Sequence, residues 1–298
     1  MVCFAPALRF DQRHSQASMT LDNTRQRIIH EWSRAAPGWR HWEAHIIAFS
    51  WPVTHRIVHA MNLAPGHRVL DVGCGIGDPA IAVADRVGPA GRVLAVDPAA
   101  EMVETARARA EGFGLANIDF QVCAAEEVEV PPGSLDAVCG RWSFIFCADV
   151  AAVLARMRGF LRPGGRLAMS TWTPMENSPG FKIINTALTR QVDLPPMDPT
   201  RPGMAQLSAP GQLDAALKAA GFGRVGVEPV PLSTFARDGE EYWRMMCEMS
   251  CSLRPVLQGL TDSQREAVRR DVLAGVESFR RGDVLRIPAM AQVGWAER

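Results

Sequence analysis

VLDVGCGIGD, residues 69–78, is the stretch of sequence that decides the fold. It begins with a largely apolar run of the kind that forms a buried strand, and a glycine-rich turn follows directly. Gly73, Gly75 and Gly77 let the backbone turn sharply and approach a ligand with no Cβ in the way. The next residues have a helical pattern, and the first N–H groups of that helix are expected to be free for an anion. The stretch predicts a strand, loop and helix that bind a nucleoside-bearing cofactor.

The spacing of the glycines narrows the choice of ligand. Dinucleotide-binding loops follow the pattern G-x-G-x-x-G, which would require a glycine at position 78. Asp78 occupies that position, so the pattern here is G-x-G-x-G. An NAD-dependent oxidoreductase is therefore the less favoured alternative.

A carboxylate follows at the distance that a nucleoside site requires. The segment GRVLAVD, residues 91–97, has the pattern of a turn and a second strand that ends on Asp97. An acidic residue about 20 residues after the glycine loop can accept hydrogen bonds from both ribose hydroxyls. The alternative for Asp97 is a solvated aspartate at a strand end.

These motifs, together with two later ones, resemble the class I S-adenosylmethionine-dependent methyltransferases. GSLDAV at residues 133–138 precedes a fourth strand, and LRPGGRLA at 161–168 leads into a fifth. The similarity covers about residues 65 to 230, and it is strongest to the ubiquinone/menaquinone-type and other small-molecule methyltransferases. It implies S-adenosylmethionine as the cofactor, held by the three loop glycines and Asp97, with Asp71 bracing the loop.

One departure from the family pattern concerns the adenine. Family members commonly carry an acidic residue after the third strand that accepts from the adenine amino group, and Ala124 stands in that place here. Adenine recognition is therefore expected to fall to backbone groups around Ala125 or to Glu126.

The alternation of strand-like and helical runs predicts an α/β fold with a doubly wound, Rossmann-like sheet of seven strands. We expect an N-terminal helical lid at residues 1–60, a cofactor-binding core at 61–235, and a helical cap insertion with the final strand at 236–298. The first helix is expected to begin at Asp22 or Thr24. Ligands in such sheets bind at the carboxyl ends of the strands, near the reversal of strand order.

Composition limits the partners. The chain has 298 residues with 32 basic and 32 acidic side chains, so no overall field attracts nucleic acid or an anionic membrane. No run of residues approaches a membrane span, and the seven cysteines are scattered, as expected for reduced thiols in a cytoplasm. We expect a small-molecule acceptor, no nucleic acid, no membrane and no metal site, and a homodimer is left open.

The lid and the first helix of the core offer candidates for contacts with the reacting groups. The ring of Trp39 could face a sulfonium cation or could pack the lid onto the core. His41 and His45 are expected on one helix face, either as a general base for the acceptor or as partly exposed polar groups.

Arg141, just after the fourth strand, is expected among the catalytic and the cofactor-binding residues. It could orient an acidic or phenolic acceptor, or it could pair with Asp97 or another carboxylate. A stripe in the cap insertion is either a pocket wall or part of the core, and it comprises Tyr242, Trp243, Met245, Met246 and Met249.

Together these features predict in-line transfer of a methyl group from S-adenosylmethionine to the oxygen, carbon or nitrogen of a small, largely apolar acceptor. The cap rich in Trp and Met favours an aromatic one. Such a transfer needs alignment and exclusion of water rather than a nucleophilic side chain. A protein that binds the cofactor only to regulate or scaffold a partner is the remaining alternative.

Overall fold

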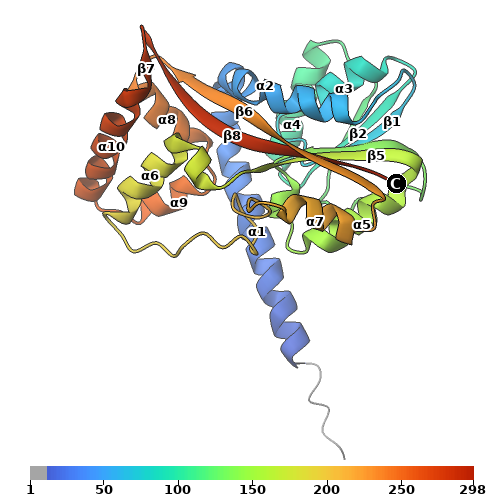
Figure 1. Ribbon diagram of the computed structural model, residues 1–298, viewed down its shortest axis with the longest axis horizontal. Helices are drawn as coiled ribbons and strands as arrows, with labels where there is room; N and C mark the ends of the chain where they lie inside the picture. The colour runs from blue at the N-terminus through green and yellow to red at the C-terminus, as the bar shows by residue number, and fades with distance from the viewer. Residues whose placement is uncertain (1–11) are drawn as a thin grey trace, which may run out of the picture.

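An eight-stranded mixed sheet organises the chain (Figure 1). The computed structural model describes residues 12–298, with side chains from residue 25 onward. The strand order is β3-β2-β1-β4-β5-β8-β6, and the two-residue β7 pairs with β8. The seven strands on the main path confirm the predicted doubly wound sheet.

The first five strands are parallel, and the last long strand is not. The parallel strands are β1 (Arg68–Val72), β2 (Arg92–Asp97), β3 (Ile118–Val122), β4 (Leu135–Arg141) and β5 (Leu161–Trp172). β8 (Val284–Glu297) runs antiparallel to β5 and to its other neighbour, β6 (Arg224–Ala236), and β7 spans Arg280–Arg281. Because β1 lies between β2 and β4, the order reverses there, and the loops after these three strands meet at one edge.

Helices cover both faces of the sheet and bury a separate apolar cluster on each. One face carries α2 (Glu43–Ala60), α3 (Ala80–Val87) and α4 (Ala100–Gly112). The other face carries α5 (Val150–Phe160) and α7 (Gln212–Ala219). Short 3-10 helices occur at Phe144–Phe146, Met175–Asn177 and Glu277–Phe279.

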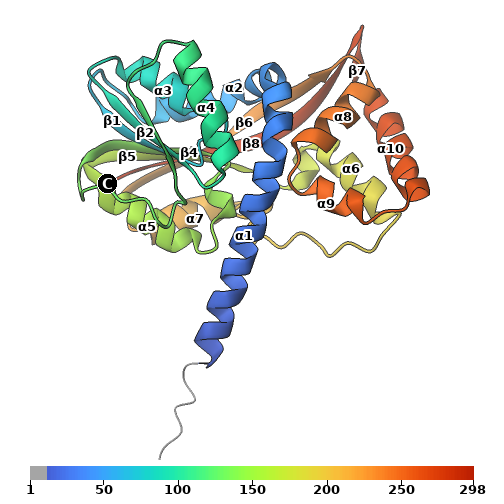
Figure 2. The ribbon, with the colours of Figure 1, turned by 180° about the vertical axis from the view of Figure 1, so that it is seen from behind.

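The first helix is longer than predicted. α1 spans Gln12–His41, so it begins ahead of both expected caps, Asp22 and Thr24. No glycine or proline interrupts residues 12–21, and nothing in that segment stops a helix. Figure 2 shows the C-terminal half of α1 lying between the sheet and the cap, while its N-terminal half projects away from both. Residues before 12 belong to the predicted lid but lie outside the described part of the chain.

A second group of helices forms a cap with an apolar core of its own. It contains α6 (Pro179–Thr189), α8 (Gly239–Met249), α9 (Leu253–Gln258) and α10 (Asp262–Val276). The long ribbon of β6 and β8 carries this group beyond the edge of the sheet (Figures 1 and 2). The division into lid, core and cap stays a prediction, and α6 is a helix of the predicted core segment that packs into the cap. Among the described helices, none has both the length and the hydropathy needed to cross a bilayer.

The third glycine of the loop sets how closely two helices approach. Gly77 has φ +108°, and a Cβ placed there would lie 2.9 Å from Ile81 Cδ1 and 3.4 Å from Ala106 Cα. Gly66, in the turn before β1, also has a positive φ of +86°, but a Cβ there would meet nothing within 4 Å. The two positions therefore share a backbone preference for glycine and differ in the space available.

Gly77→Ala is expected to lower the free energy of unfolding by about 3 kcal/mol, because backbone strain adds to the overlap with α4. Gly66→Ala, the matched control, should cost only the strain, about 1 kcal/mol. Chemical denaturation of both variants measures the difference. Equal losses would show that Gly77 is not needed for helix packing.

Candidate functional site

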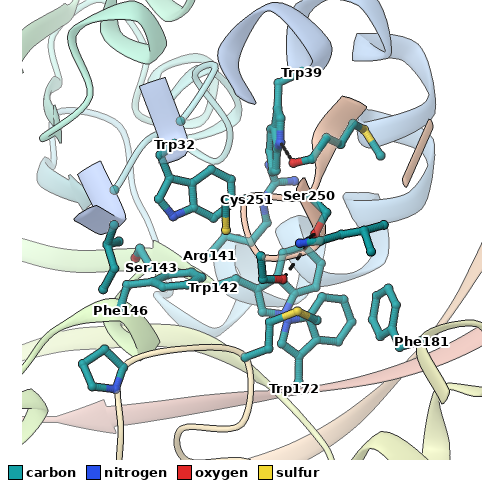
Figure 3. A pocket seen from close by; sticks show the side chains of 18 of the residues that line it. Trp32, Trp39, Arg141, Trp142, Ser143, Phe146, Trp172, Phe181, Ser250 and Cys251 are labelled. Atoms are coloured by element: carbon teal, nitrogen blue, oxygen red, sulfur yellow. Dashed lines mark hydrogen bonds between the residues drawn. The ribbon is translucent and has the colours of Figure 1, made fainter. Parts of the chain in front are cut away.

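A cavity of about 680 Å³ lies between the carboxyl ends of the strands, α1 and the cap (Figure 3). Gly73, Gly75 and Asp97 line it at the sheet, and Met246 and Met249 line it at the cap. Two ligands, one on the sheet and one under the cap, can therefore meet in a single space.

The amide groups of the glycine loop are already bonded. Gly73 and Cys74 both donate to the carbonyl oxygen of Val96, at 2.7 and 3.0 Å. Gly75 donates to Asp97 Oδ2 at 2.9 Å. At the start of the helix that follows, Ala80 N donates to Asp71 Oδ2 at 2.9 Å and Ile81 N donates to the carbonyl oxygen of Gly77 at 2.8 Å, so the prediction of free helix N–H groups for an anion is wrong. A ligand at this loop meets its Cα faces and carbonyl groups, and a diphosphate would find no cradle of donors.

Two predicted cofactor residues act from behind the loop. Asp71 is fully buried and does not line the cavity. Its Oδ2 accepts from the N–H of Ala80 at 2.9 Å, and its Oδ1 accepts from the thiol of Cys139 at 3.5 Å. This bracing is the role predicted for Asp71, but it also uses the first N–H of α3. Gly77 does not line the cavity either, since it packs against α4. The prediction that Asp71 and Gly77 contact the cofactor is therefore wrong. Both residues support the loop from behind.

Asp97 faces the cavity with hydrogen-bonding capacity to spare. Its Oδ1 accepts from Ala99 N and its Oδ2 from Gly75 N, both at 2.9 Å. Each carboxylate oxygen has a second lone pair, so two hydroxyl donors can still bind. The residue is 8% exposed, and burial raises the pKa of its carboxyl to about 6, against the two backbone hydrogen bonds that lower it. Asp97 is therefore not a solvated strand end.

The segment after β3 and the lid line the same end of the cavity. Ala124, Ala125 and Glu126 all line the cavity, as predicted for an adenine site. Trp32 of α1 and Phe146 also line it, and their rings meet edge to face at 5.4 Å between centroids. Glu126 is the acidic side chain of this segment that lines the cavity, and adenine recognition by Glu126 or by backbone groups around Ala125 stays a prediction.

Trp39 both lines the cavity and anchors the lid. Its Nε1 donates to the carbonyl oxygen of Met249 at 2.9 Å, as Figure 3 shows. Trp42 Nε1 donates to Glu248 Oε2 at 2.8 Å, and Gly38 lies against the backbone of the same glutamate. The two roles considered for Trp39 therefore coexist, because one edge of the indole holds α8 while the ring faces the cavity.

The two candidate histidines do not share a helix face. α1 ends at His41 and α2 begins at Glu43, and both imidazoles lie edge-on against Trp42, which stands between the helices. His41 is exposed and does not line the cavity, so it is withdrawn as a catalytic base. His45 is half-buried and lines the cavity.

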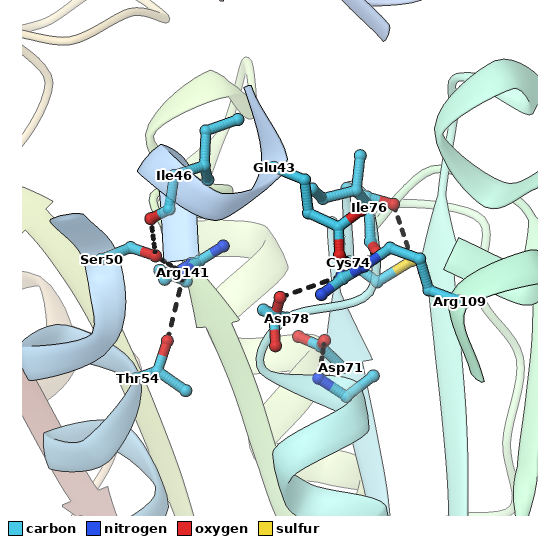
Figure 4. A network of polar contacts seen from close by, with 12 residues as sticks. Glu43, Ile46, Ser50, Thr54, Asp71, Cys74, Ile76, Asp78, Arg109 and Arg141 are labelled. Atoms are coloured by element: carbon cyan, nitrogen blue, oxygen red, sulfur yellow. Dashed lines mark hydrogen bonds and ion pairs between the residues drawn. The ribbon is translucent and has the colours of Figure 1, made fainter. Parts of the chain in front are cut away.

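Arg141 is held by hydroxyl groups rather than by a carboxylate (Figure 4). Its Nη1 donates to Ser50 Oγ and, at 3.1 Å, to Thr54 Oγ1, both on α2. Among the described side chains it forms no ion pair, so the alternative of a pair with Asp97 or another carboxylate is not realised; Asp97 accepts from backbone N–H groups. Arg141 is 9% exposed and lines the cavity, and burial lowers the pKa of its guanidinium.

A different arginine ties the glycine loop to the lid. Arg109 of α4 donates to Glu43 Oε1 at 2.7 Å, to Asp78 Oδ2 at 3.0 Å and to the carbonyl oxygen of Ile76 (Figure 4). No sequence pattern predicts this contact, because the four groups come from α4, the start of α2 and the loop. Arg109 thereby neutralises the negative charge of Asp78, the residue whose presence in the loop argued against a dinucleotide.

An aromatic wall forms the acceptor side of the cavity. Trp142 and Trp172 stack with centroids 4.6 Å apart and rings 8° from parallel. Phe49 packs beside this pair at 6.0 and 6.2 Å, and Phe181 meets Trp172 edge-on at 5.0 Å. Trp142 Nε1 is buried without a hydrogen-bond partner. Periodicity could not find this wall, because its members come from four parts of the chain, although Trp142 directly follows β4 and Trp172 is the last residue of β5.

The Met and aromatic stripe of the cap divides between the two roles considered for it. Met245, Met246 and Met249 line the cavity, whereas Tyr242 and Trp243 are packed in the apolar core of the cap. Met245 has both roles, since it is also buried in that apolar core.

The chain is similar to known methyltransferases. A family model described as "Methyltransferase domain" matches residues 69–165. Nocamycin O-methyltransferase from Saccharothrix syringae is 33% identical over 185 residues, which cover 59% of this chain and 66% of that protein. Aklanonic acid methyltransferase DauC from Streptomyces sp. (strain C5) is 39% identical over 125 residues, covering 42% and 57%. The chain thus spans less than two thirds of either relative.

The fold has solved counterparts as well. The YcgJ protein from Bacillus subtilis superimposes with a TM-score of 0.53 at 18% identity, over 82% of this chain and 97% of that chain. At this identity the match speaks for the fold alone. Sequence and structural matches together agree with the family resemblance and the fold predicted from the motifs.

Arg109→Met is expected to destabilise the protein by about 2 kcal/mol, because it leaves the half-buried Asp78 without its cation. Arg107→Met is the matched control on the same helix, since Arg107 is exposed and bonds only the carbonyl oxygen of Phe120. Thermal and chemical denaturation of both variants give the comparison. An Arg109 variant as stable as the control would contradict the role assigned to this contact.

Proposed function

We propose that the chain is a class I S-adenosylmethionine-dependent methyltransferase that methylates a small, largely apolar acceptor bound under the cap. The observation that carries the proposal is the single cavity that joins the glycine loop and Asp97 to the aromatic wall. Cofactor and acceptor can face each other there without crossing solvent.

The residues present fit S-adenosylmethionine. Asp97 has two lone pairs left for ribose hydroxyls, and the end of the cavity lined by Ala125 and Glu126 can hold the base. Gly73 and Gly75 offer a surface without side chains, and Trp39 offers an aromatic face to a cation. The occupied loop amides and Asp78 disfavour a dinucleotide diphosphate, so an oxidoreductase is the weaker assignment.

When bound, the cofactor supplies a methyl group activated by a sulfonium centre. The protein then has to align the acceptor with that group and keep water out. The stacked pair of Trp142 and Trp172 provides a flat surface that favours an aromatic acceptor. The methionines of α8 close the cavity on the opposite side and can adapt to different shapes.

A general base is required only for acceptors that must lose a proton to react. His45 is the histidine that lines the cavity among the described residues, so it is the candidate for that role. Arg141 can orient an acceptor or the cofactor from the end of β4. A regulator that binds the cofactor without turnover remains the rival function, and it would show binding with no methylated product from any aromatic acid, phenol or amine.

The proposed setting is a reducing compartment such as the cytoplasm, with small molecules as partners. Six described cysteines are free, and four of these are buried: Cys74, Cys123, Cys139 and Cys147. This usage fits thiols that are not needed for disulfides.

S-adenosylmethionine is expected to bind the purified protein, and Asp97→Ala should weaken its binding about 30-fold by removing charge-assisted hydrogen bonds to the ribose. Asp119→Ala is the control, since Asp119 is an exposed carboxylate on the neighbouring strand β3. Isothermal titration calorimetry measures both, with NAD as a second ligand. Tighter binding of NAD than of S-adenosylmethionine would refute the assignment.

The affinity for S-adenosylhomocysteine should fall as the pH decreases through about 6. Ribose hydroxyls donate to the ionised carboxylate of Asp97, whose pKa burial raises to about 6, so below that pH a proton competes with the ligand. Each further pH unit should cost up to about tenfold in affinity. Titrations between pH 5 and 8 should show this fall in the wild type and a smaller one in Asp97→Asn. An identical pH profile for the two proteins would exclude Asp97 as the titrating group.

A further inference from the structure

The guanidinium of Arg141 is a buried charge with room for one more partner. It is 9% exposed, and of its nitrogens only Nη1 has hydrogen-bond partners, the hydroxyls of Ser50 and Thr54. Hydroxyl groups donate and accept hydrogen bonds but carry no charge to offset that of the arginine. A buried cation without an anion costs several kcal/mol, so the cavity is set up to gain from an anionic ligand.

The charges of Asp78 and Asp71 act on Arg141, but the hydrogen bonds and ion pairs of these carboxylates, and those of Asp97, go to other groups. Asp78 is paired with Arg109 at 3.0 Å. Asp71 accepts from Ala80 N and the Cys139 thiol, behind the loop and off the cavity wall. Asp97 accepts from two backbone N–H groups. Within the described part of the chain, no carboxylate forms an ion pair with Arg141, so an anionic ligand can provide one.

The surroundings of Arg141 indicate what that ligand looks like. Its guanidinium carbon lies 5.7 Å from the ring centroid of Trp142, which in turn stacks on Trp172. The N–H donors of the guanidinium thus lie over Trp142, the first ring of the aromatic wall. The other arginine that lines the cavity, Arg25, forms an ion pair with Glu127 at the far, adenine end. With one arginine available at this end of the cavity, a ligand with a single negative charge fits best. A carboxylate is planar like the guanidinium and can bind it through two parallel hydrogen bonds.

Resting on the methyltransferase assignment above, we propose that the acceptor is a planar aromatic carboxylate whose acid group binds Arg141 and whose ring lies along Trp142 and Trp172. Arg141 is then the residue that determines specificity for acids over neutral analogues. The contact to Ser50 and Thr54 fixes one side of the guanidinium and leaves the other side to the acceptor.

The test compares 2-naphthoic acid with 2-naphthamide, which has the same rings and no charge. Both are titrated into the protein saturated with S-adenosylhomocysteine, so that the cofactor's own carboxylate is already in place. The acid is expected to bind at least tenfold more tightly than the amide. Arg141→Met should abolish this preference, and Arg141→Lys, which keeps the charge, should retain part of it.

Trp172→Leu is the matched control on the aromatic wall. It should weaken the acid and the amide by a similar factor and so leave their ratio unchanged. Equal affinity of the wild type for acid and amide would overturn the proposal while leaving the cofactor assignment intact, because binding of S-adenosylhomocysteine is measured in the same protein. Failure of S-adenosylhomocysteine to bind would instead refute the proposed function.

The cofactor also carries a carboxylate, which could bind Arg141 in place of the acceptor. A further pair of titrations distinguishes these two ligands. 5′-Methylthioadenosine lacks the amino acid part of S-adenosylhomocysteine but keeps the adenosine and the sulfur. If Arg141 binds the acceptor, Arg141→Met should leave the affinities for both nucleosides within about threefold of wild type. A loss of affinity for S-adenosylhomocysteine alone would assign the guanidinium to the cofactor and overturn the proposal.

Discussion

The two hydrogen bonds that Asp97 accepts from the backbone join the loop after β1 to the loop after β2, and the cavity depends on this junction. Gly75 N reaches across to Oδ2, and Ala99 N caps Oδ1 from the start of the next helix. The loop amides are consumed within the protein, so the loop is a preformed surface rather than a phosphate cradle. The same carboxylate keeps two lone pairs toward the cavity, so one residue both shapes the site and is ready to bind a ribose.

The rest of the site is assembled from segments that lie far apart in the chain. α1 reaches the cap through Trp39 and Trp42, whose indole N–H groups bond residues of α8 and its end. Arg109 fastens the loop to the start of α2, and α2 in turn supplies the hydroxyls that hold Arg141. Lid, loop and acceptor wall are thus linked by a few buried polar contacts, which makes their relative positions specific.

The sheet and the cofactor end of the site could be predicted from the sequence because their signals are local. A glycine loop after an apolar run, a carboxylate one strand later and a turn before the fifth strand each lie within a few residues, and the structure places them as expected. Asp71 and Gly77 needed correction because sequence spacing does not distinguish residues that face a ligand from residues that support the loop behind it.

The acceptor end was less predictable, for a physical reason. Trp142, Trp172, Phe49 and Phe181 meet only after the sheet and the cap have formed, and no helical or strand period connects them. The partners of Arg141 were missed for the same reason, since Ser50 and Thr54 lie on a helix about 90 residues earlier in the chain. The prediction that His41 acts as a base was wrong because the helix breaks at Trp42. This break turns the ring of His41 out of the cavity, although its i, i+4 spacing from His45 suggested a shared helix face.

The central claim is that one cavity holds a methyl donor on the glycine loop and an acceptor against the aromatic wall. A crystal structure of the protein with S-adenosylhomocysteine tests it most directly. We predict the ribose hydroxyls on Asp97, the adenine beside Ala125 and Glu126, and the sulfur facing the space in front of Trp142. A ligand bound elsewhere, or one whose sulfur points away from that wall, would contradict the account.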